Sequence, residues 1–231
     1  MKIGLFADPH YAQREKSGER RFNRLSKQKI TECYGVFARE GCSMAICLGD
    51  LIDNEPTHEQ EISDLEEIAA VIHASGVPTV CVMGNHDAFA FTAEEYYSVL
   101  GGCEPKDMQF PGSALIFLDA CYYRDGTRYA PRGGDWRNTF LPDTEGLKAA
   151  LGRARGSVYV FLHQNLDPGA TAEHRLSNAD EVIDILEKSG KVKAVCQGHY
   201  HPGSHTVKNG IEYVSLRAMC EYDGAYEIID I

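Results

Sequence analysis

The chain has 231 residues, of which 43% are hydrophobic and 25% charged, a composition typical of a globular protein. Its formal net charge of −11 disfavours bulk binding to nucleic acid, because proteins that bind nucleic acid normally carry a basic surface. The apolar start is too short for a signal peptide, and no apolar run approaches the ~20 residues that a membrane helix needs. The eight cysteines contain no Cys-x-x-Cys pair, so we expect free thiols, a reducing compartment and a cytoplasmic protein.

Strands and helices are predicted to alternate along most of the chain. Apolar runs predict buried strands at residues 2–7, 44–48, 79–83, 114–118, 158–162 and 193–197. Apolar residues at helical spacing predict helices at 26–39, 59–74, 92–100, 143–154 and 178–188. The C-terminal part predicts antiparallel strands at 204–207, 210–216 and 225–229, with a hairpin turn at 208–210. No linker or repeat interrupts this α/β pattern, so we expect a single domain over residues 1–231.

Residues 121–140 are rich in tyrosine, arginine and glycine and predict a loop. The loop follows the strand at 114–118, so it could overhang a site and select the substrate there. Its side chains could stack on a base and hold a second phosphate, the candidates being Arg124, Arg128, Tyr129 and Trp136. Equally, it could be a surface loop whose aromatic side chains only pack beneath it.

Five predicted strands end in side chains that can bind a metal. The clearest is 80–87, where an apolar run stops at Gly84, which lets the backbone turn sharply or adopt a positive φ, and Asn-His-Asp follows. The full set is Asp8 with His10, Asp50 with Asp53, Asn85 with His86, His163, and His199 with His201. Ligands bind at the carboxyl ends of strands in open α/β sheets, so we expect these groups to converge. Other histidines, such as His174, are expected on the surface or behind the ligands.

These donors favour two metal ions over one. Oxygen and imidazole ligands without thiolate suit Mn²⁺, Fe or Zn²⁺. The seven donors exceed what one tetrahedral ion takes, and suit two ions that share a carboxylate. Two divalent ions, two carboxylates and a bridging hydroxide leave about +1, which would attract a phosphate anion into an acidic protein. Taken singly, a residue such as His163 or Asp50 would more often be structural.

The motifs, in this order, resemble the signature of the calcineurin-like metallophosphoesterases. The resemblance implies an α/β fold of two packed mixed β-sheets flanked by helices, an αββα sandwich. It implies two metal sites that share Asp50, one with Asp8, His10 and His201 and the other with Asn85, His163 and His199. It also implies catalytic roles for His86, which would protonate the leaving group, and for Asp87, which would orient His86. Asp53 would lie behind the ligands, and Asn54–Glu55 depart from the family pattern.

We therefore predict a dinuclear metal-dependent phosphoesterase in which metal-activated water attacks phosphorus. The expected substrates are small anionic phosphoesters or nucleotide-like diphosphates, with no membrane partner. A further similarity, to manganese-dependent ADP-ribose/CDP-alcohol diphosphatases, depends on residues outside the catalytic motifs: Phe6–Asp8, Tyr11, Arg20–Arg21, Leu118–Ala120 and Glu221. The alternatives are a cyclic-nucleotide phosphodiesterase, a nuclease, or a non-catalytic scaffold, which the complete ligand set disfavours. The sequence leaves the oligomeric state open.

Overall fold

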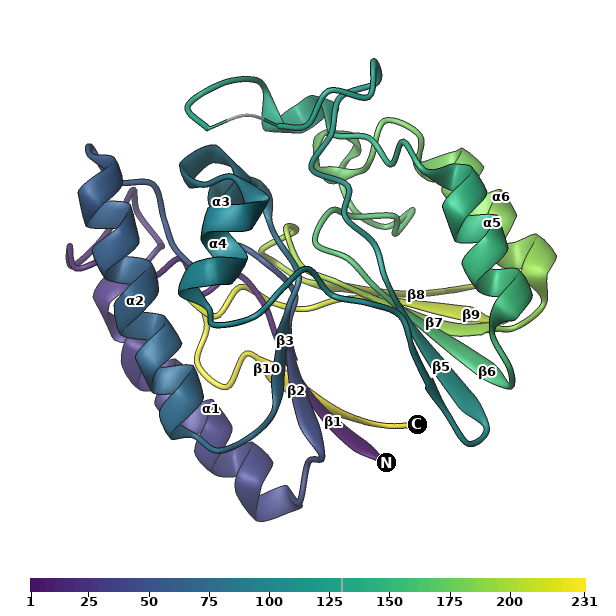
Figure 1. The fold of residues 1–231 in the computed structure, drawn as a ribbon, viewed down its shortest axis with the longest axis horizontal. Coiled ribbons are helices and arrows are strands. Elements are labelled where there is room, and N and C mark those ends of the chain that lie inside the picture. Colours follow the sequence, from purple (N-terminus) through teal and green to yellow (C-terminus); the bar gives the residue numbers. More distant parts are fainter. Residues whose placement is uncertain (130) are drawn as a thin grey trace.

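A computed structural model describes residues 1–129 and 131–231 as two mixed β-sheets packed between layers of helices (Figure 1). The first sheet has the order β10 (Tyr226–Asp230), β1 (Lys2–Phe6), β2 (Met44–Cys47), β3 (Thr79–Cys81). The second has the order β4 (Met108–Phe110), β5 (Ser113–Phe117), β6 (Ser157–Phe161), β7 (Val192–Gln197), β9 (Ile211–Ser215), β8 (Ser204–Lys208). This architecture confirms the predicted αββα sandwich.

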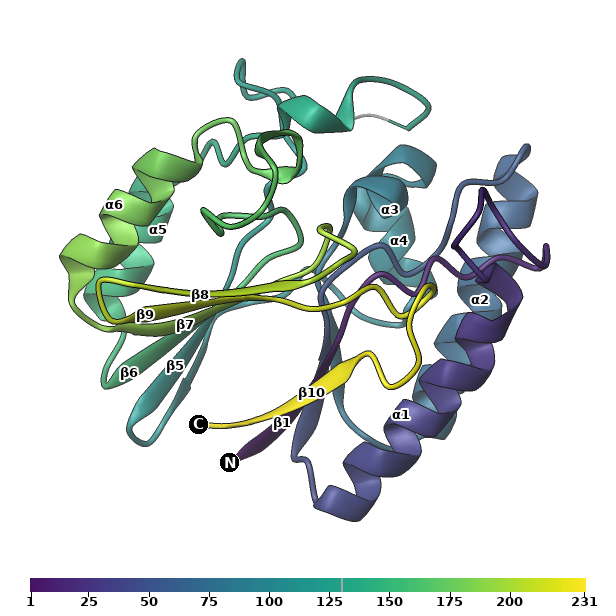
Figure 2. The ribbon, with the colours of Figure 1, turned by 180° about the vertical axis from the view of Figure 1, so that it is seen from behind.

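The two outer layers are formed by two pairs of long helices. The first sheet is covered by α1 (Ser26–Glu40) and α2 (His58–Ala74), and the second by α5 (Thr144–Arg153) and α6 (Ala179–Ser189) (Figures 1 and 2). Two short helices, α3 (Asn85–Ala90) and α4 (Ala93–Val99), follow β3. The termini lie side by side, and the Met1 amino group donates a hydrogen bond to the Ile231 carbonyl at 2.7 Å.

The central strands are apolar throughout because both of their faces are buried. In β1, Ile3 and Leu5 pack between the sheets, whereas Phe6 packs on the helix side with Phe37 of α1. Gly4 also lies on the helix side, where a Cβ would come within 2.5 Å of the Phe37 ring. Continuous apolar runs therefore serve two hydrophobic layers at once, as the sequence predicted for buried strands.

Three local features differ from the sequence prediction. The short edge strand β4 was not predicted, since its middle residue Gln109 is exposed and it has no buried run. The C-terminal strands are not all antiparallel: β9 pairs antiparallel with β8 but parallel with β7, and β10 joins the first sheet antiparallel to β1. Asn85 begins the short helix α3, which was not among the predicted helices. The predicted hairpin is confirmed, with positive φ at Asn209 and Gly210.

None of the helices in the described ranges is long and apolar enough to cross a lipid bilayer.

Candidate metal centre

All seven predicted ligands converge between the sheets at the carboxyl ends of strands. The loops after β1 and β2 run side by side, because Asp8 N donates to the Gly49 carbonyl at 3.1 Å and His10 N to the Asp50 carbonyl at 2.9 Å. The loop after β7 joins them through His199 N, which donates to the Asp8 carboxylate at 3.0 and 3.1 Å. Residues far apart in the sequence are thus fixed against one another by their own backbone.

Backbone strain is concentrated at these ligands. Within the described ranges, six residues other than glycine have a positive φ, and four of them are predicted ligands: Asp8 (52°), His10 (44°), Asp50 (52°) and His199 (65°). Residues other than glycine rarely adopt a positive φ, because the Cβ atom then lies too close to the backbone. Such backbone strain persists only where the surrounding structure enforces it. The chain is therefore bent after β1, β2 and β7 so that these side chains point into the site.

The first donor set gathers around the imidazole of His10. Its Nε2 lies 3.5 Å from Asp50 Oδ2, 3.9 Å from Asp8 Oδ1 and 3.2 Å from His201 Nε2. His201 Nε2 lies 3.7 Å from Asp8 Oδ1, so all four predicted ligands face one point. The Cys220 thiol also lies within 4.8 Å of the ligand atoms of His10 and His201, which the sequence did not predict.

The second donor set gathers around His163. Its Nε2 lies 3.1 Å from Asn85 Oδ1 and 3.3 Å from Asp50 Oδ2, and Asp50, His163 and His199 bring ligand atoms within 4.8 Å of one another. Asp50 Oδ2 is common to both sets. This geometry fits two ions bridged by one carboxylate.

Position 84 requires glycine because Asp50 approaches its backbone closely, and not because of its backbone conformation. Its φ of −98° is open to any residue, so of the two uses expected for this glycine, a sharp turn or a positive φ, the positive φ is not adopted. A Cβ at this position would overlap with Oδ1 and the backbone nitrogen of Asp50. Gly49 needs both properties, since its φ is 95° and a Cβ would lie 2.6 Å from His163 Nδ1.

Hydrogen bonds orient two of the imidazoles that are predicted ligands. His163 Nδ1 donates to the Leu48 carbonyl at 2.7 Å, which leaves Nε2 as the atom available to a metal. His201 Nδ1 donates to Glu221 Oε1 at 2.6 Å, with the same result for its Nε2. Glu221 follows β9 in the sequence, and only the similarity described above singled it out.

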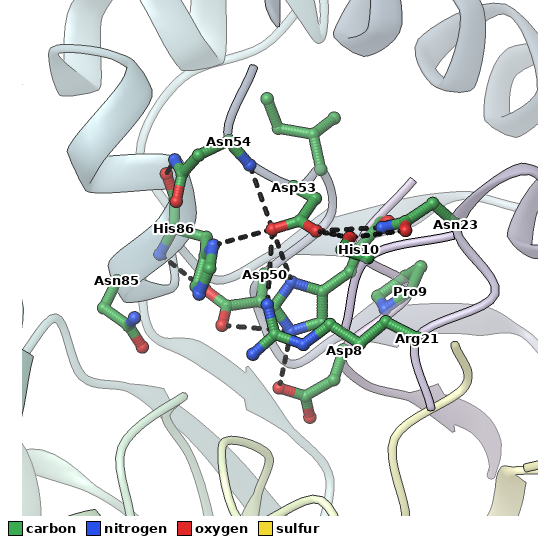
Figure 3. Close-up of polar contacts among 12 residues, drawn as sticks. Asp8, Pro9, His10, Arg21, Asn23, Asp50, Asp53, Asn54, Asn85 and His86 are labelled. Carbon is green, nitrogen blue, oxygen red and sulfur yellow. Dashed lines mark hydrogen bonds and ion pairs between the residues drawn. The ribbon is translucent and has the colours of Figure 1, made fainter. Parts of the chain in front are cut away.

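Asp53 holds together the outer part of the centre (Figure 3). Its carboxylate lies 3.1 Å from His86 Nδ1 and 3.8 Å from His10 Nδ1. It also accepts hydrogen bonds from Arg14 at 2.7 Å and from Asn23 at 2.9 Å. Asp53 is therefore the carboxylate that faces His86.

Asp87 does not have the role that the resemblance implied. Its carboxylate accepts from the backbone nitrogens of Gly84 at 2.9 Å and Leu51 at 3.0 Å. These bonds cap α3 and join it to the loop after β2, so the side chain supports the backbone and does not contact His86.

The charge balance of the centre suits divalent cations. Asp8, Asp50 and Asp53 are buried together, and buried carboxylates need a compensating positive charge. Burial acts to raise the pKa of Asp50, but the charges of His163 and His86 hold it well below its usual range. Burial also acts to lower the pKa of His163, yet the charges of Asp50 and Asp8 raise it to about 9. The residues present therefore fit a pair of divalent ions.

A cavity of about 280 Å³ opens over these ligands. Arg20 and Arg21 line it beside Glu221, and Trp136 and His174 line it beside His199. His174 was expected on the surface or behind the ligands, but its ring lies 5.2 Å from that of His199. A larger cavity of about 630 Å³ beside β3 is lined by none of the predicted ligands.

Of the four predicted substrate contacts in the loop, the structure brings Trp136 to this cavity. Arg128 instead pairs with Asp119 at 2.6 Å, because that carboxylate lies beside it at the end of β5. Tyr129 is 4% exposed and packs against Tyr123, and Arg124 is exposed and does not line the cavity. The structure therefore does not bring these three residues to the cavity over the predicted ligands.

The model of the calcineurin-like phosphoesterase family matches residues 1–203. The chain belongs to this family. This is the family that the order of the motifs predicted.

Curated relatives are distant. The chain is 23% identical over 191 residues to a probable cyclic nucleotide phosphodiesterase of Psychrobacter sp. (strain PRwf-1), a match of 75% of this chain to 51% of that protein. It therefore spans about half the length of this relative. It is 22% identical over 276 residues to a manganese-dependent ADP-ribose/CDP-alcohol diphosphatase of Oryza sativa subsp. japonica, covering 96% of this chain and 84% of that one.

Among solved structures, a dimetal phosphatase from Danio rerio has the same fold. The two superpose with a TM-score of 0.85 at 20% sequence identity, over 98% of this chain and 91% of that one.

Proposed function

We propose that this metallophosphoesterase hydrolyses small phosphoesters or nucleotide-like diphosphates at a dinuclear centre, with His86 as the general acid. The observation that carries the proposal is the sharing of Asp50 Oδ2 by two donor sets beneath the cavity that His86 also lines. The expected metals are Mn²⁺, Fe or Zn²⁺, held by Asp8, His10, Asp50 and His201 and by Asp50, Asn85, His163 and His199.

When bound, the ions would supply an activated water and electrostatic stabilisation of the phosphoryl oxygens. The protein supplies the geometry and the proton. The backbone nitrogen of His86 donates to Asp50 Oδ1 at 2.8 Å, which fixes the imidazole beside the bridging carboxylate. Asp53 faces its Nδ1, so Nε2 is free to donate a proton to the leaving oxygen as the bond from phosphorus to that oxygen breaks.

The cavity supports a small substrate with two chemically different ends. Its volume of about 280 Å³ is at the small end of ligand pockets and excludes a polymer from deep binding. Arg20 and Arg21 at one end suit a second phosphate, and the rings of Trp136 and His174 at the other suit a base. The names of the relatives, a cyclic nucleotide phosphodiesterase and an ADP-ribose/CDP-alcohol diphosphatase, support a nucleotide.

The direct test is hydrolysis by the Mn²⁺-loaded protein across phosphomonoesters, 3′,5′-cyclic nucleotides and nucleotide diphosphate esters. We expect the diphosphate esters to have the highest kcat/KM. Preference for cyclic nucleotides would establish the alternative, and turnover of none of them would refute the proposal.

The role of His86 is tested with His86→Ala. Since a poor leaving group needs protonation, hydrolysis of alkyl phosphoesters should fall by about 10²–10⁴-fold. Hydrolysis of p-nitrophenyl esters should fall much less, because p-nitrophenolate leaves without a proton. Equal losses on both would exclude general-acid catalysis by this residue. The contact between Trp136 and a base is tested with Trp136→Ala. An unchanged preference of this variant for nucleotide substrates would exclude that contact.

A further inference from the structure

The end of the loop crosses over the metal centre as a strap, which we define as residues 131–139. In Figures 1 and 2 this segment passes above α3 and reaches the side of the molecule formed by α5 and α6. It contains a single helical turn at Trp136–Asn138, so its own secondary structure cannot fix the position of the Trp136 side chain. Contacts with the neighbouring elements must do so, and those at its two ends tie it to the helices.

The first end is fixed to α2 and α3 by Arg132. Its backbone nitrogen donates to the Phe89 carbonyl at 2.7 Å, and its Nη2 donates to Glu61 Oε2 at 2.7 Å. Its Nη1 also donates to the Glu55 carbonyl at 3.1 Å. Arg132 has a φ of 62°, a strained conformation that these contacts stabilise.

Glu61 is an unusual partner because its side chain is fully buried. A buried carboxylate is costly unless it is paired and hydrogen-bonded. Its other contacts are the Glu55 backbone nitrogen at 3.2 Å and His58 Nδ1 at 3.5 Å. The guanidinium of Arg132 is therefore held in place by a charge with little access to solvent.

The second end is fixed near α6. The Thr139 carbonyl accepts a hydrogen bond from Ser177 N at 3.0 Å. Just beyond it, Leu141 and the Asn178 side chain exchange two hydrogen bonds, at 3.1 and 3.0 Å. The strap is thus tied to the helices of both halves of the sandwich.

Between the two ends, Trp136 lies against the metal centre. Its ring centroid is 5.3 Å from that of His174 and 5.0 Å from that of the ligand His199. The Arg137 guanidinium lies over its outer side, 4.4 Å from the centroid, and pairs with Glu173 at 3.5 Å.

We propose that Glu61 and Arg132 are positioning residues that fix Trp136 at the cavity and thereby set the preference for substrates that carry an aromatic base. The substrate preference rests on the proposed function. The position of Trp136 does not, because it follows from the ion pair and the strap alone.

Trp136 is the single tryptophan of the chain, so its fluorescence reports the position of the strap directly. Glu61→Gln keeps the shape of the side chain and removes its charge, and Arg132→Ala removes the partner. We expect both variants to show red-shifted emission and stronger quenching by acrylamide, with little further change in the double variant because the two residues act as one unit. Arg132→Lys keeps the positive charge, so its emission should lie closer to that of the wild type than the emission of Arg132→Ala does. Lys27→Ala is the matched control, because it removes an ion pair between Glu67 of α2 and another helix without touching the strap.

The kinetic comparison uses ADP-ribose and P1,P2-dimethyl diphosphate, which has the same linkage without a base. For ADP-ribose, KM should rise by about tenfold, the effect of losing one stacking contact, with little change in kcat. For the dimethyl compound, both constants should stay close to wild type.

Unchanged emission and unchanged KM in correctly folded Glu61→Gln would overturn the inference, even if Arg132→Ala fails to fold. An equal loss on both substrates would also overturn it, since that result indicates general damage. A wild-type protein that hydrolyses neither compound would refute the diphosphatase activity on which the substrate preference rests, and the fluorescence comparison would still decide whether the pair positions Trp136.

Discussion

Replacing Asp53 with asparagine removes one charge and almost no volume from the outer part of the metal centre. The carboxylate is 4% exposed and faces two imidazoles, with His86 Nδ1 at 3.1 Å and His10 Nδ1 at 3.8 Å. It also pairs with Arg14 at 2.7 Å and with Arg21 at 3.3 Å. Asparagine can accept hydrogen bonds but cannot balance the charges of the two arginines. Its NH₂ group would also face the groups that donate to the carboxylate, so one of these hydrogen bonds would be lost.

The expected magnitudes follow from these contacts. Hydrogen bonds to charged groups contribute about 1.5–3 kcal/mol each. Both arginine side chains are about 30% exposed and Arg14 keeps Glu55 as a partner, so we expect a net loss of about 2 kcal/mol in the free energy of unfolding. For a chain of this size that is about 4–8 °C in Tm. Loss of the negative charge that faces the predicted ligand His10, 3.8 Å from its Nδ1, should weaken Mn²⁺ binding by about 10-fold.

The assay is Mn²⁺ titration by calorimetry together with turnover of an alkyl and a p-nitrophenyl ester. Asp53→Asn should weaken binding of one ion more than the other, because it faces His10 and not the ligands of the second set. At saturating Mn²⁺ it should still hydrolyse the alkyl ester poorly, since His86 has lost its partner. Asp180→Asn, which removes an exposed pair with Arg175, is the control. Wild-type affinity and wild-type turnover of the alkyl ester would refute the role assigned to Asp53.

Three further predictions concern single sites. Gly84→Ala should displace the Asp50 carboxylate and weaken binding of both ions in the same titration, whereas loss of one ion alone would contradict a shared Asp50. Glu221→Gln should weaken one ion only, by about 10-fold or more, because it frees the His201 ring; equal effects on both ions would contradict the assignment. Asp64 is buried, and burial and the nearby Glu55 raise its pKa to about 6, so the unfolded chain releases this proton first and stability falls as pH rises from about 4 to about 6. Asp64→Asn should therefore raise Tm by about 2–4 °C at pH 7 and not at pH 4, as measured by thermal melts; an equal gain at both values would exclude the charge as the cause.

The sequence allowed most of the fold to be predicted because the buried strands are continuous apolar runs. The edge strand β4, which has three residues, an exposed centre and no such run, was not predicted. The pairing of β9 with β7 also could not be predicted. Alternation shows that residues form a strand, but the neighbour of that strand is decided by how the whole sheet assembles.

The convergence of the predicted metal ligands could be foreseen because each lies within a few residues of the end of an apolar run. Their orienting partners could not. Asp87 is adjacent to His86 in sequence, yet α3 turns its carboxylate towards the backbone of Gly84, and Asp53 reaches His86 from another loop. Glu221 carries no local pattern that marks it as the partner of His201.

The loop shows the same limit. Its composition indicated contact with substrate, and the structure brings Trp136 to the cavity but directs Arg128 to Asp119. Which arginine pairs with which carboxylate depends on distances between elements, and these are absent from the sequence. The same holds for the pair of Arg132 and Glu61, which are 71 residues apart.

The central claim is a pair of cations that share Asp50, and anomalous scattering from a manganese-loaded crystal tests it most directly. The account predicts two peaks on either side of the Asp50 carboxylate, one facing His10 and His201 and the other facing Asn85, His163 and His199. A single peak, or manganese bound elsewhere with these side chains turned apart, would contradict it.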